Sequence, residues 1–520
     1  METINLVWLR RDLRLHDNQL FTTEILENKA SVFFFIWDED YLDHSEASVK
    51  RAQFLLESLK NLREELDKQN CKLRIFYGKS KEIIFNLLKL LNKENKLVRL
   101  IFSREAEVAY STELDESLLK NVNELNCKVK LCTNNFLLTR ESEMDSWREQ
   151  YYAYQKAKRH KPAEKLIQLN SHLQFPKETS LEEIEKLLPG QKFNLFKGGE
   201  VEANRELNNF LQKRAYGYHW KLSRPWLAQM GATSHLSPHV YFGTISTRDI
   251  SQRVRQAIKD TDNSKYKFSL KAFLDRIRWR DSFTQRLYFH PEIIWQNRHR
   301  EFDAVYCKDE LPREKQALLT AWQEGQTGFP LIDASMRHLL ENGWMNFRMR
   351  SMCATFLTIN CGISWHHGAE YFMKHLIDAD YAINNWQWQM QAGITNPLSE
   401  TFRIYNPITN LKERDERLEY THYWVPELKS FYLQELLDLK WINKVNYPSP
   451  ILDWSLTRKV NGKIISDLRK KTRERIVKEK GLEFQEALIA KKVVQKYYEG
   501  KQAQYEQLVL DYKMENDGNL

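Results

Sequence analysis

The feature that most constrains this chain is a change of pattern near residue 135. Before it, short runs rich in β-branched and aromatic residues alternate with stretches whose apolar residues recur at three- and four-residue spacing. The β-type runs are residues 4–9, 32–37, 72–77, 98–102 and 129–132, and the helical pattern is strongest over 49–68 and 81–91. Because parallel strands need helical crossovers, this alternation predicts a doubly wound parallel sheet.

After residue 200 the strand signal nearly disappears, and helical runs rich in Trp, Tyr and Phe continue to about residue 454. The intervening sequence is polar and interrupted by Pro and Gly, which is typical of an interdomain connection. We therefore predict an α/β domain over 1–135, a connection over 136–199 and an all-α domain over 200–455. Residues 456–520 predict a basic helical extension, because they hold too few apolar residues for a core of their own.

Composition excludes several classes of protein. The 520 residues carry 79 Lys and Arg against 70 Asp and Glu, a net charge of +9, which permits a polyanion partner but is also ordinary for solubility. The six cysteines have neither a C-x-x-C pair nor the spacing of a zinc or iron-sulfur site. The sequence shows no signal peptide and no apolar run long enough to span a bilayer. We expect a cytoplasmic protein without a bound metal and without a membrane partner.

The groups suited to chemistry lie in the helical half. The first predicted strand lacks a following G-x-G-x-x-G turn, so the α/β domain is not an ordinary dinucleotide site. Residues 233–238 carry hydroxyls before a proline at a helix start, where free N–H groups hold a phosphate, although such a turn is most often only a helix cap.

A second group of polar residues recurs at helical spacing. Asp380, Asn384 and Trp388 share one helix face, which is either solvated or binds a ligand with donors, acceptors and a large flat ring. Arg350 lies in an apolar stretch and needs an acid if it is buried, and Asp378 is the candidate.

In their order and spacing, these motifs make the chain resemble the photolyase and cryptochrome flavoprotein family from residue 3 to about residue 455. The matching segments are 7–14, 198–200, 233–238, 279–280, 328–334, 343–345, 378–380, and Arg403 with Asn406 and Pro407. The resemblance implies an antenna-type α/β domain and a helical domain that holds a folded FAD. The FAD-binding positions of the family then fall on Tyr218, Thr233, Ser234, His235, Leu236, Ser237, Arg280, Arg350, Asp378, Ala379, Asp380 and Asn384.

The resemblance also implies roles in photochemistry. Asn384 matches the amide beside the flavin N5, and Trp388 and Trp365 match the first two indoles of the family's electron relay. The third relay position holds Pro312, so the electron path must use another ring, either Tyr306 or a nearby Trp.

The positions that contact damaged DNA depart from the family. Members that repair cyclobutane dimers usually carry Glu where Arg276 stands, Asn where Phe347 stands and Met where Ser351 stands. The absence of a His pair at Asn346 and Phe347 argues more strongly against repair of (6-4) photoproducts. We expect contacts with UV-damaged DNA at Arg276, Phe347, Arg348 and Arg403.

Two functions follow from the resemblance. One is a blue-light photolyase, a carbon-carbon lyase that splits pyrimidine dimers in DNA by electron transfer from reduced FAD. The alternative is a cryptochrome-type receptor that photoreduces its flavin without repair and acts on a protein partner through the tail after residue 455. We expect a monomer in both cases. The second, antenna chromophore stays unidentified, because folate-binding relatives use a polar pair near Glu105 to Val108 and Val108 is apolar.

Overall fold

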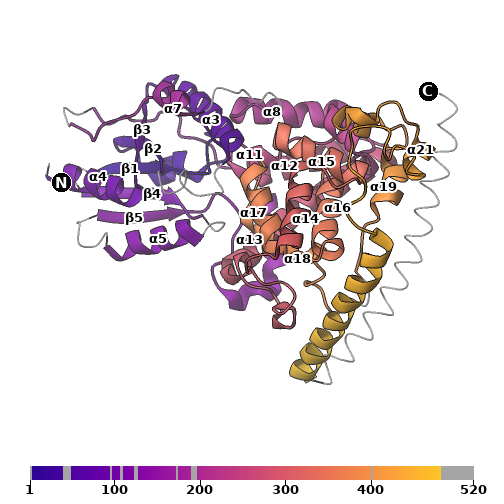
Figure 1. Ribbon diagram of the computed structural model, residues 1–520. Helices are drawn as coiled ribbons and strands as arrows, with labels where there is room; N and C mark the ends of the chain where they lie inside the picture. Colours follow the sequence, from indigo (N-terminus) through magenta and orange to yellow (C-terminus); the bar gives the residue numbers. More distant parts are fainter. Residues whose placement is uncertain are drawn as a thin grey trace.

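The computed structural model describes residues 3–38, 48–93, 97–105, 109–121, 127–170, 174–188, 196–399 and 402–481. Figure 1 shows an α/β domain at the left, a helical domain at the right and a long helix of residues 454–481 below it. This arrangement confirms the predicted fold class. Val108 and residues 482–520 of the predicted extension lie outside the described residues.

The α/β domain is built on one parallel sheet with strand order β3-β2-β1-β4-β5. The strands are β1 (Thr3–Leu9), β2 (Ser31–Trp37), β3 (Leu73–Tyr77), β4 (Leu97–Ser103) and β5 (Cys127–Cys132). Helix α3 (Val49–Asp67) packs on the face that carries Val7, and α4 (Ser80–Lys93) on the face that carries Leu6. Because both faces are covered, the inner strands are mostly apolar, with Asn5 in β1 and Arg99 in β4 as exceptions, and this makes them recognisable in the sequence.

The connection is more ordered than its composition indicates. It contains α6 (Trp147–Lys156) and α7 (Leu181–Leu187). Helix α7 begins at a capping box formed by Ser180 and Glu183, and it packs along α3, where Lys60 pairs with Glu185 at 2.7 Å. A polar helix held by caps and ion pairs gives little hydrophobic periodicity, so the sequence pattern does not reveal it.

The second domain is helical, and the described residues after 174 contain no strand. Its principal helices are α8 (Glu200–Asn209), α11 (Ser237–Tyr241), α12 (Thr247–Asp260), α13 (Ser264–Phe289), α14 (Arg313–Glu324), α15 (Pro330–Asn342), α16 (Phe347–Thr355), α17 (Trp365–His375), α18 (Tyr381–Gln391), α19 (Pro407–Arg414), α20 (Glu419–Trp424) and α21 (Leu433–Leu437). Their core is rich in large aromatic rings, including the buried Trp322, Trp365, Trp388 and Trp441. The long aromatic runs of the sequence are therefore core-facing helices.

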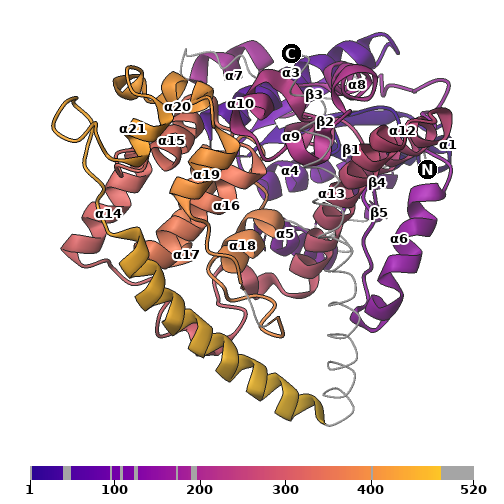
Figure 2. The same cartoon turned by 90° about the vertical axis from the view of Figure 1, so that its right-hand side faces the viewer.

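The two domains lie against each other (Figures 1 and 2), and buried polar contacts join them. The buried Arg248 of α12 forms an ion pair with Asp17, and Glu200 accepts a hydrogen bond from the backbone N–H of Leu15 at 2.8 Å. Gly243 has φ +67°, and a Cβ there would collide with the carbonyl of Arg11. The helical domain therefore lies directly against the chain that leaves β1.

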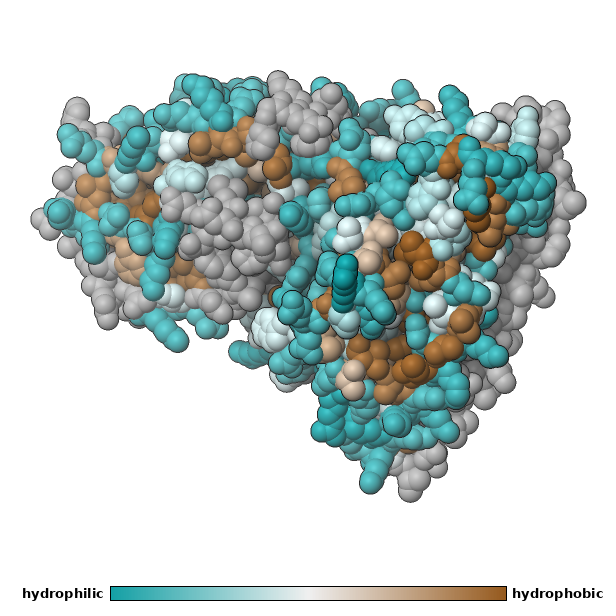
Figure 3. Space-filling view, viewed as in Figure 1, coloured by the Kyte–Doolittle hydropathy of each residue, from teal (hydrophilic) through white to brown (hydrophobic). Residues whose placement is uncertain are grey.

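The helix of residues 454–481 joins the core of the helical domain. Ile465 is buried in that core, and the buried guanidinium of Arg469 donates to four backbone carbonyls of the segment after α18. These carbonyls belong to Gly393, Thr395, Asn396 and Ser399. The extension thus fixes the segment between α18 and residue 399. No helix among the described residues is both long and apolar enough to cross a bilayer. Figure 3 shows a largely hydrophilic face with apolar side chains in smaller groups over both domains.

Candidate functional site

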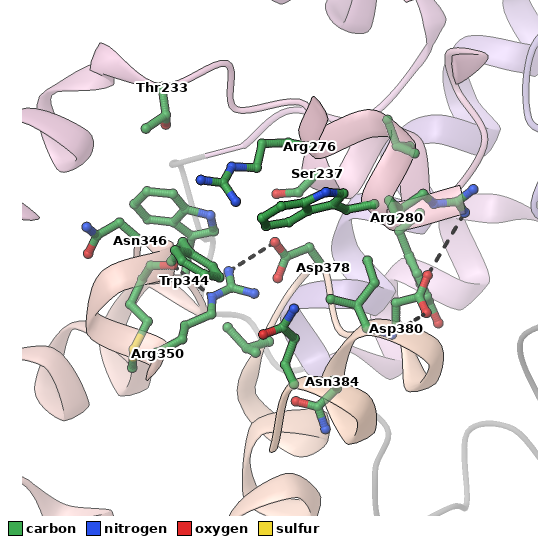
Figure 4. Close-up of a pocket in the computed structure, with 18 of the residues that line it drawn as sticks. Thr233, Ser237, Arg276, Arg280, Trp344, Asn346, Arg350, Asp378, Asp380 and Asn384 are labelled. Atoms are coloured by element: carbon green, nitrogen blue, oxygen red, sulfur yellow. Dashed lines mark hydrogen bonds and ion pairs between the residues drawn. The ribbon is translucent and has the colours of Figure 1, made fainter. Parts of the chain in front are cut away.

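A large cavity in the helical domain collects the residues that the sequence singled out (Figure 4). All twelve positions expected to bind FAD line it, although they are spread over more than 160 residues of the chain. Trp388, Arg276 and Phe347 line it as well, whereas Trp365, Arg348 and Arg403 do not. The fold therefore assembles the expected site, and the role of each residue stays a prediction.

Hydroxyl groups form one part of the cavity wall. Helix α11 has Leu236 as its N-cap without a side-chain cap bond, so the hydroxyls before it are not helix caps. Thr233 Oγ1 is buried and has no hydrogen-bond partner in the described part of the chain, which is costly unless a ligand supplies one. Burial also raises the pKa of Tyr218 in this wall to about 12, so its phenol keeps its proton at neutral pH.

The predicted pair of Arg350 and Asp378 is present. Arg350 Nη2 lies 3.0 Å from Asp378 Oδ2, and Arg350 Nε donates to the carbonyl of Met345 at 2.8 Å. The guanidinium is thus held by two different partners. Asp378 Oδ1 is buried and has no hydrogen-bond partner among the described residues. The pair therefore offers one carboxylate oxygen to a ligand that donates a hydrogen bond.

Asp380 begins the helix that carries the amide and the first indole. Its Oδ1 accepts from the backbone N–H groups of Ala382 at 2.9 Å and Ile383 at 3.4 Å, which makes it the N-cap of α18. Its other oxygen lies 4.0 Å from Arg280 Nη2. Asp380 therefore positions α18 in the cavity wall as well as lining the wall itself.

Asn384 lines the cavity with its amide group. Both hydrogens of its amide are used within the protein, since Nδ2 donates to the carbonyl of Ala369 at 3.0 Å and to Asn385 Oδ1 at 3.1 Å. No described residue donates to its oxygen, which is left as an acceptor. Such a group can accept a hydrogen bond from a ring N–H of a bound ligand.

Trp388 lies against α17 because that helix has a glycine at the point of contact. A Cβ on Gly368 would collide with the Trp388 indole. The Trp388 ring also contacts Phe372, with centroids 4.9 Å apart, and Trp322, with centroids 6.0 Å apart. The sequence does not indicate the contact with Trp322, which depends on how the folded domain places α14 and α18.

The other rings of the expected relay are buried. Trp365 donates its Nε1–H to Asn297 Oδ1 at 2.7 Å. Tyr306 is 1% exposed and donates to the carbonyl of Ala392 at 3.1 Å, so Tyr306 does not itself provide a surface end for the relay. Pro312, at the position of the missing third indole, is the N-cap of α14.

The mouth of the cavity carries an exposed aromatic ring and a cation. Trp279 on α13 is 43% exposed. The guanidinium carbon of Arg276 lies 4.5 Å from the ring centroid of Trp279 and 5.1 Å from that of Phe347. Two of the three departures from the family, at 276 and 347, are therefore in contact with each other.

A cluster of arginines lies outside the cavity. Arg348 stacks on Tyr405 at 4.9 Å, and its buried Nε has no hydrogen-bond partner among the described residues. Burial, together with the charges of Arg348 and Arg224, lowers the pKa of Arg414. Arg403 is exposed. The sequence missed Arg224 and Arg414, because nothing in their local sequence distinguishes them from other surface cations.

At the edge of the sheet in the α/β domain, a small crevice is largely filled by the protein's own side chains. It lies at the carboxyl ends of β1 and β4, where doubly wound sheets bind ligands. Arg10 forms an ion pair there with Asp115 at 2.9 Å, and Asn134 donates to Ser103 Oγ at 2.7 Å. This agrees with the missing glycine-rich turn and identifies no second chromophore.

The large cavity fits FAD in the chemistry of its wall. Three buried polar atoms without partners in the described chain line it, namely Thr233 Oγ1, Asp378 Oδ1 and Gln387 Oε1. Gln387 was missed, although its place one turn after Asn384 on the same helix was a usable signal. Hydroxyls suit a pyrophosphate, and carboxylate and amide oxygens suit the N–H edge of a flavin. The fold and the cavity thus define a flavoprotein whose cofactor lies in a helical domain beside a doubly wound sheet.

Comparisons with known proteins agree with this class. Residues 5–177 match the family model described as DNA photolyase, and residues 273–467 match that described as the FAD binding domain of DNA photolyase. The chain belongs to the photolyase and cryptochrome family. It is 27% identical to the deoxyribodipyrimidine photo-lyase of Buchnera aphidicola from Baizongia pistaciae, over 88% of this chain and 96% of the relative. It is also 27% identical to the deoxyribodipyrimidine photo-lyase of Escherichia coli, over 87% of this chain and 96% of the relative.

Solved structures show the same fold. An archaeal photolyase from Sulfolobus tokodaii, described with two FAD molecules, has a TM-score of 0.72 at 25% identity, covering 90% of this chain and all of its own. A cryptochrome from Synechocystis has a TM-score of 0.74 at 24% identity, covering 89% of this chain and 99% of its own. These two structures therefore resemble this chain about equally in overall shape.

Proposed function

We propose that the protein is a blue-light-dependent photolyase that binds UV-damaged DNA and splits pyrimidine dimers. The observation that carries the proposal is a single cavity that joins a wall suited to FAD with an open mouth lined by an exposed indole and an arginine. FAD, when bound and reduced, supplies light absorption and one electron, which returns after the cyclobutane bonds have broken.

The residues of the wall bind and orient the cofactor in this proposal. Arg350 and Asp378 would hold the flavin with a fixed charge pair, and the Asn384 oxygen would accept a hydrogen bond from it. Thr233 and Ser237 bind the pyrophosphate. Trp388 and Trp365 supply electrons when the bound flavin starts oxidised.

The arginines outside the cavity bind the DNA backbone. Besides burial, the charges of Arg348 and Arg224 lower the pKa of Arg414, so a bound polyanion relieves the repulsion among these three arginines. Arg403 adds a further cation. The dimer leaves the duplex to reach the cavity, since a base inside the stack cannot approach a ring held among helices.

The receptor function is the second candidate, and one observation favours it. Arg276 and Phe347 replace the residues with which family members contact the lesion, and a receptor has no need of that contact. In that case the partner is a protein and not damaged DNA. For either function we propose a monomer in the cytoplasm.

Illumination separates the two candidates. The FAD-loaded, reduced protein is mixed with an oligonucleotide that contains a thymine dimer and exposed to blue light. Recovery of pyrimidine absorbance in the light, with none in the dark and none with the FAD-free protein, supports the photolyase. Absence of recovery under saturating light, with the dimer bound or unbound, rejects it in favour of the receptor.

A further inference from the structure

Arg276 holds an unusual position at the mouth of the cavity. It is half-buried, and its guanidinium carbon lies over the rings of Trp279 and Phe347, 4.5 Å and 5.1 Å from their centroids. In Figure 4 the Arg276 side chain lies above the ion pair of Arg350 and Asp378. A substrate that approaches a cofactor in this cavity therefore passes Arg276.

The N–H donors of Arg276 are unused. Within the described part of the chain, its guanidinium has no hydrogen-bond or ion-pair partner, in contrast to Arg350 and Arg280, which each contact a carboxylate. Contacts with two aromatic faces fix a guanidinium through its π-surface and leave the in-plane N–H groups available. The side chain is thus held in place with its donors directed away from the rings.

The departures from the family at 276 and 347 act together in this geometry. Phe347 supplies one of the two rings that contact Arg276. The Asn that relatives carry at this position has no aromatic ring and cannot make that contact. Glu at position 276 would accept hydrogen bonds, whereas the guanidinium only donates. The exchange of both residues therefore converts an acceptor into a fixed donor at the same place.

We propose that Arg276 is the lesion-contacting residue of this enzyme and donates hydrogen bonds to the carbonyl oxygens of the dimerised pyrimidines. This inference rests on the proposed photolyase function. The exposed indole of Trp279 gives a flat surface beside the guanidinium on which a pyrimidine ring stacks, while backbone phosphates have the separate cluster of Arg224, Arg348 and Arg414.

The same contact assists the reaction. One electron enters the dimer, its two cyclobutane bonds between the rings break, and the electron returns, so the lesion carries a negative charge only transiently. That charge resides largely on the carbonyl oxygens, next to a permanently protonated guanidinium in a partly desolvated site. Arg276 stabilises it without transferring a proton.

The test uses three thymine-dimer oligonucleotides and the FAD-loaded protein. The first oligonucleotide is unmodified. The dimer of the second is methylated at both N3 atoms, so it keeps its carbonyl groups but loses its N–H groups. The third has a neutral linkage in place of the phosphate within the dimer. Dark affinity is measured by fluorescence anisotropy, and repair is measured per absorbed photon. The variants are Arg276→Gln and Arg276→Glu. The control is Arg278→Gln, which removes a cation of the same helix that instead pairs with Asp275.

The inference predicts that the wild type binds the methylated and unmodified dimers within about threefold of each other. Arg276→Gln should lose about tenfold to a hundredfold in affinity, the range for a hydrogen bond to a charged group. Its FAD content should be unchanged. Arg276→Glu should acquire a preference for the unmodified over the methylated dimer, and Arg278→Gln should resemble the wild type.

Three results overturn the inference. In the first, the wild-type protein fails to bind the methylated dimer. In the second, Arg276→Gln binds and repairs the dimer as well as the wild type does. In the third, Arg276→Gln weakens binding of the unmodified dimer but not of the dimer with the neutral linkage, which would assign the contact to the phosphate. In each of these the wild type still repairs the unmodified dimer, so the proposed function stands. A wild type that repairs no dimer overturns the proposed function and this inference with it.

Discussion

Asp378→Asn gives a direct test of the cofactor wall. In the wild type, Oδ2 pairs with Arg350 at 3.0 Å, and the buried Oδ1 has no partner in the described chain. Asparagine retains an oxygen for Arg350 but replaces the other oxygen by an NH2 group, which turns an acceptor into a donor. If Oδ1 accepts a hydrogen bond from FAD, its loss costs about 1.5–3 kcal/mol, the usual range for a charged hydrogen bond. The dissociation constant for FAD should then rise by about 10- to 150-fold.

Titration of the FAD-free protein with FAD, followed by the quenching of flavin fluorescence, measures this effect. The matched control is Glu370→Gln, which neutralises an exposed carboxylate on α17 that pairs with Lys308. That variant should bind FAD as the wild type does. Equal FAD affinity in Asp378→Asn and wild type would refute the assignment of Asp378 to the cofactor.

Three further predictions follow from named residues. Trp388→Phe should slow flavin photoreduction sharply while FAD stays bound, because phenylalanine is far harder to oxidise than tryptophan. Trp365→Phe should slow photoreduction less. If transient absorption shows unchanged photoreduction, these rings do not belong to the electron path. Arg348→Ala and Arg403→Ala should each weaken binding to damaged duplex DNA. Each should also reduce the slope of log K against log salt by about 0.9 for every phosphate that the arginine neutralises. An unchanged slope would exclude a phosphate contact by that arginine. Burial lowers the pKa of His338 to about 3, so the folded state keeps it neutral while the unfolded state protonates it below about pH 6.5. Protonation of His338 in the unfolded state should therefore lower the free energy of unfolding by about 2 kcal/mol between pH 7 and pH 5. Urea unfolding of His338→Phe should lack this part of the pH dependence. An equal pH dependence in the variant and the wild type would contradict the prediction.

The sheet was predictable because both of its faces are covered. Each strand that the sequence indicated is present, with ends within two residues of the expected ones. The connection was predicted less well, because α7 is held by a capping box and surface ion pairs and carries few apolar residues. Hydrophobic periodicity detects only helices that bury an apolar face.

Motifs in the sequence predicted most of the residues discussed in the cavity wall. The residues and contacts that the prediction missed show which features a local motif cannot reveal. Arg350 and Asp378 were paired from their residue types alone, and the pair is present. Gln387 was within reach of the same argument, since it follows Asn384 by three residues. The contact of Trp322 with Trp388 and the approach of Arg348 to Arg414 depend on how separate helices pack, so no local pattern could reveal them.

The central claim is that one cavity holds both the flavin and the lesion. It is tested most directly by titrating the FAD-loaded protein in the dark with a dimer-containing oligonucleotide while recording the visible flavin spectrum. The account predicts a saturable change in the spectrum at one oligonucleotide per protein, absent with the undamaged sequence. An unchanged flavin spectrum while anisotropy shows the damaged oligonucleotide fully bound would contradict the account, because the lesion would then lie away from the cofactor.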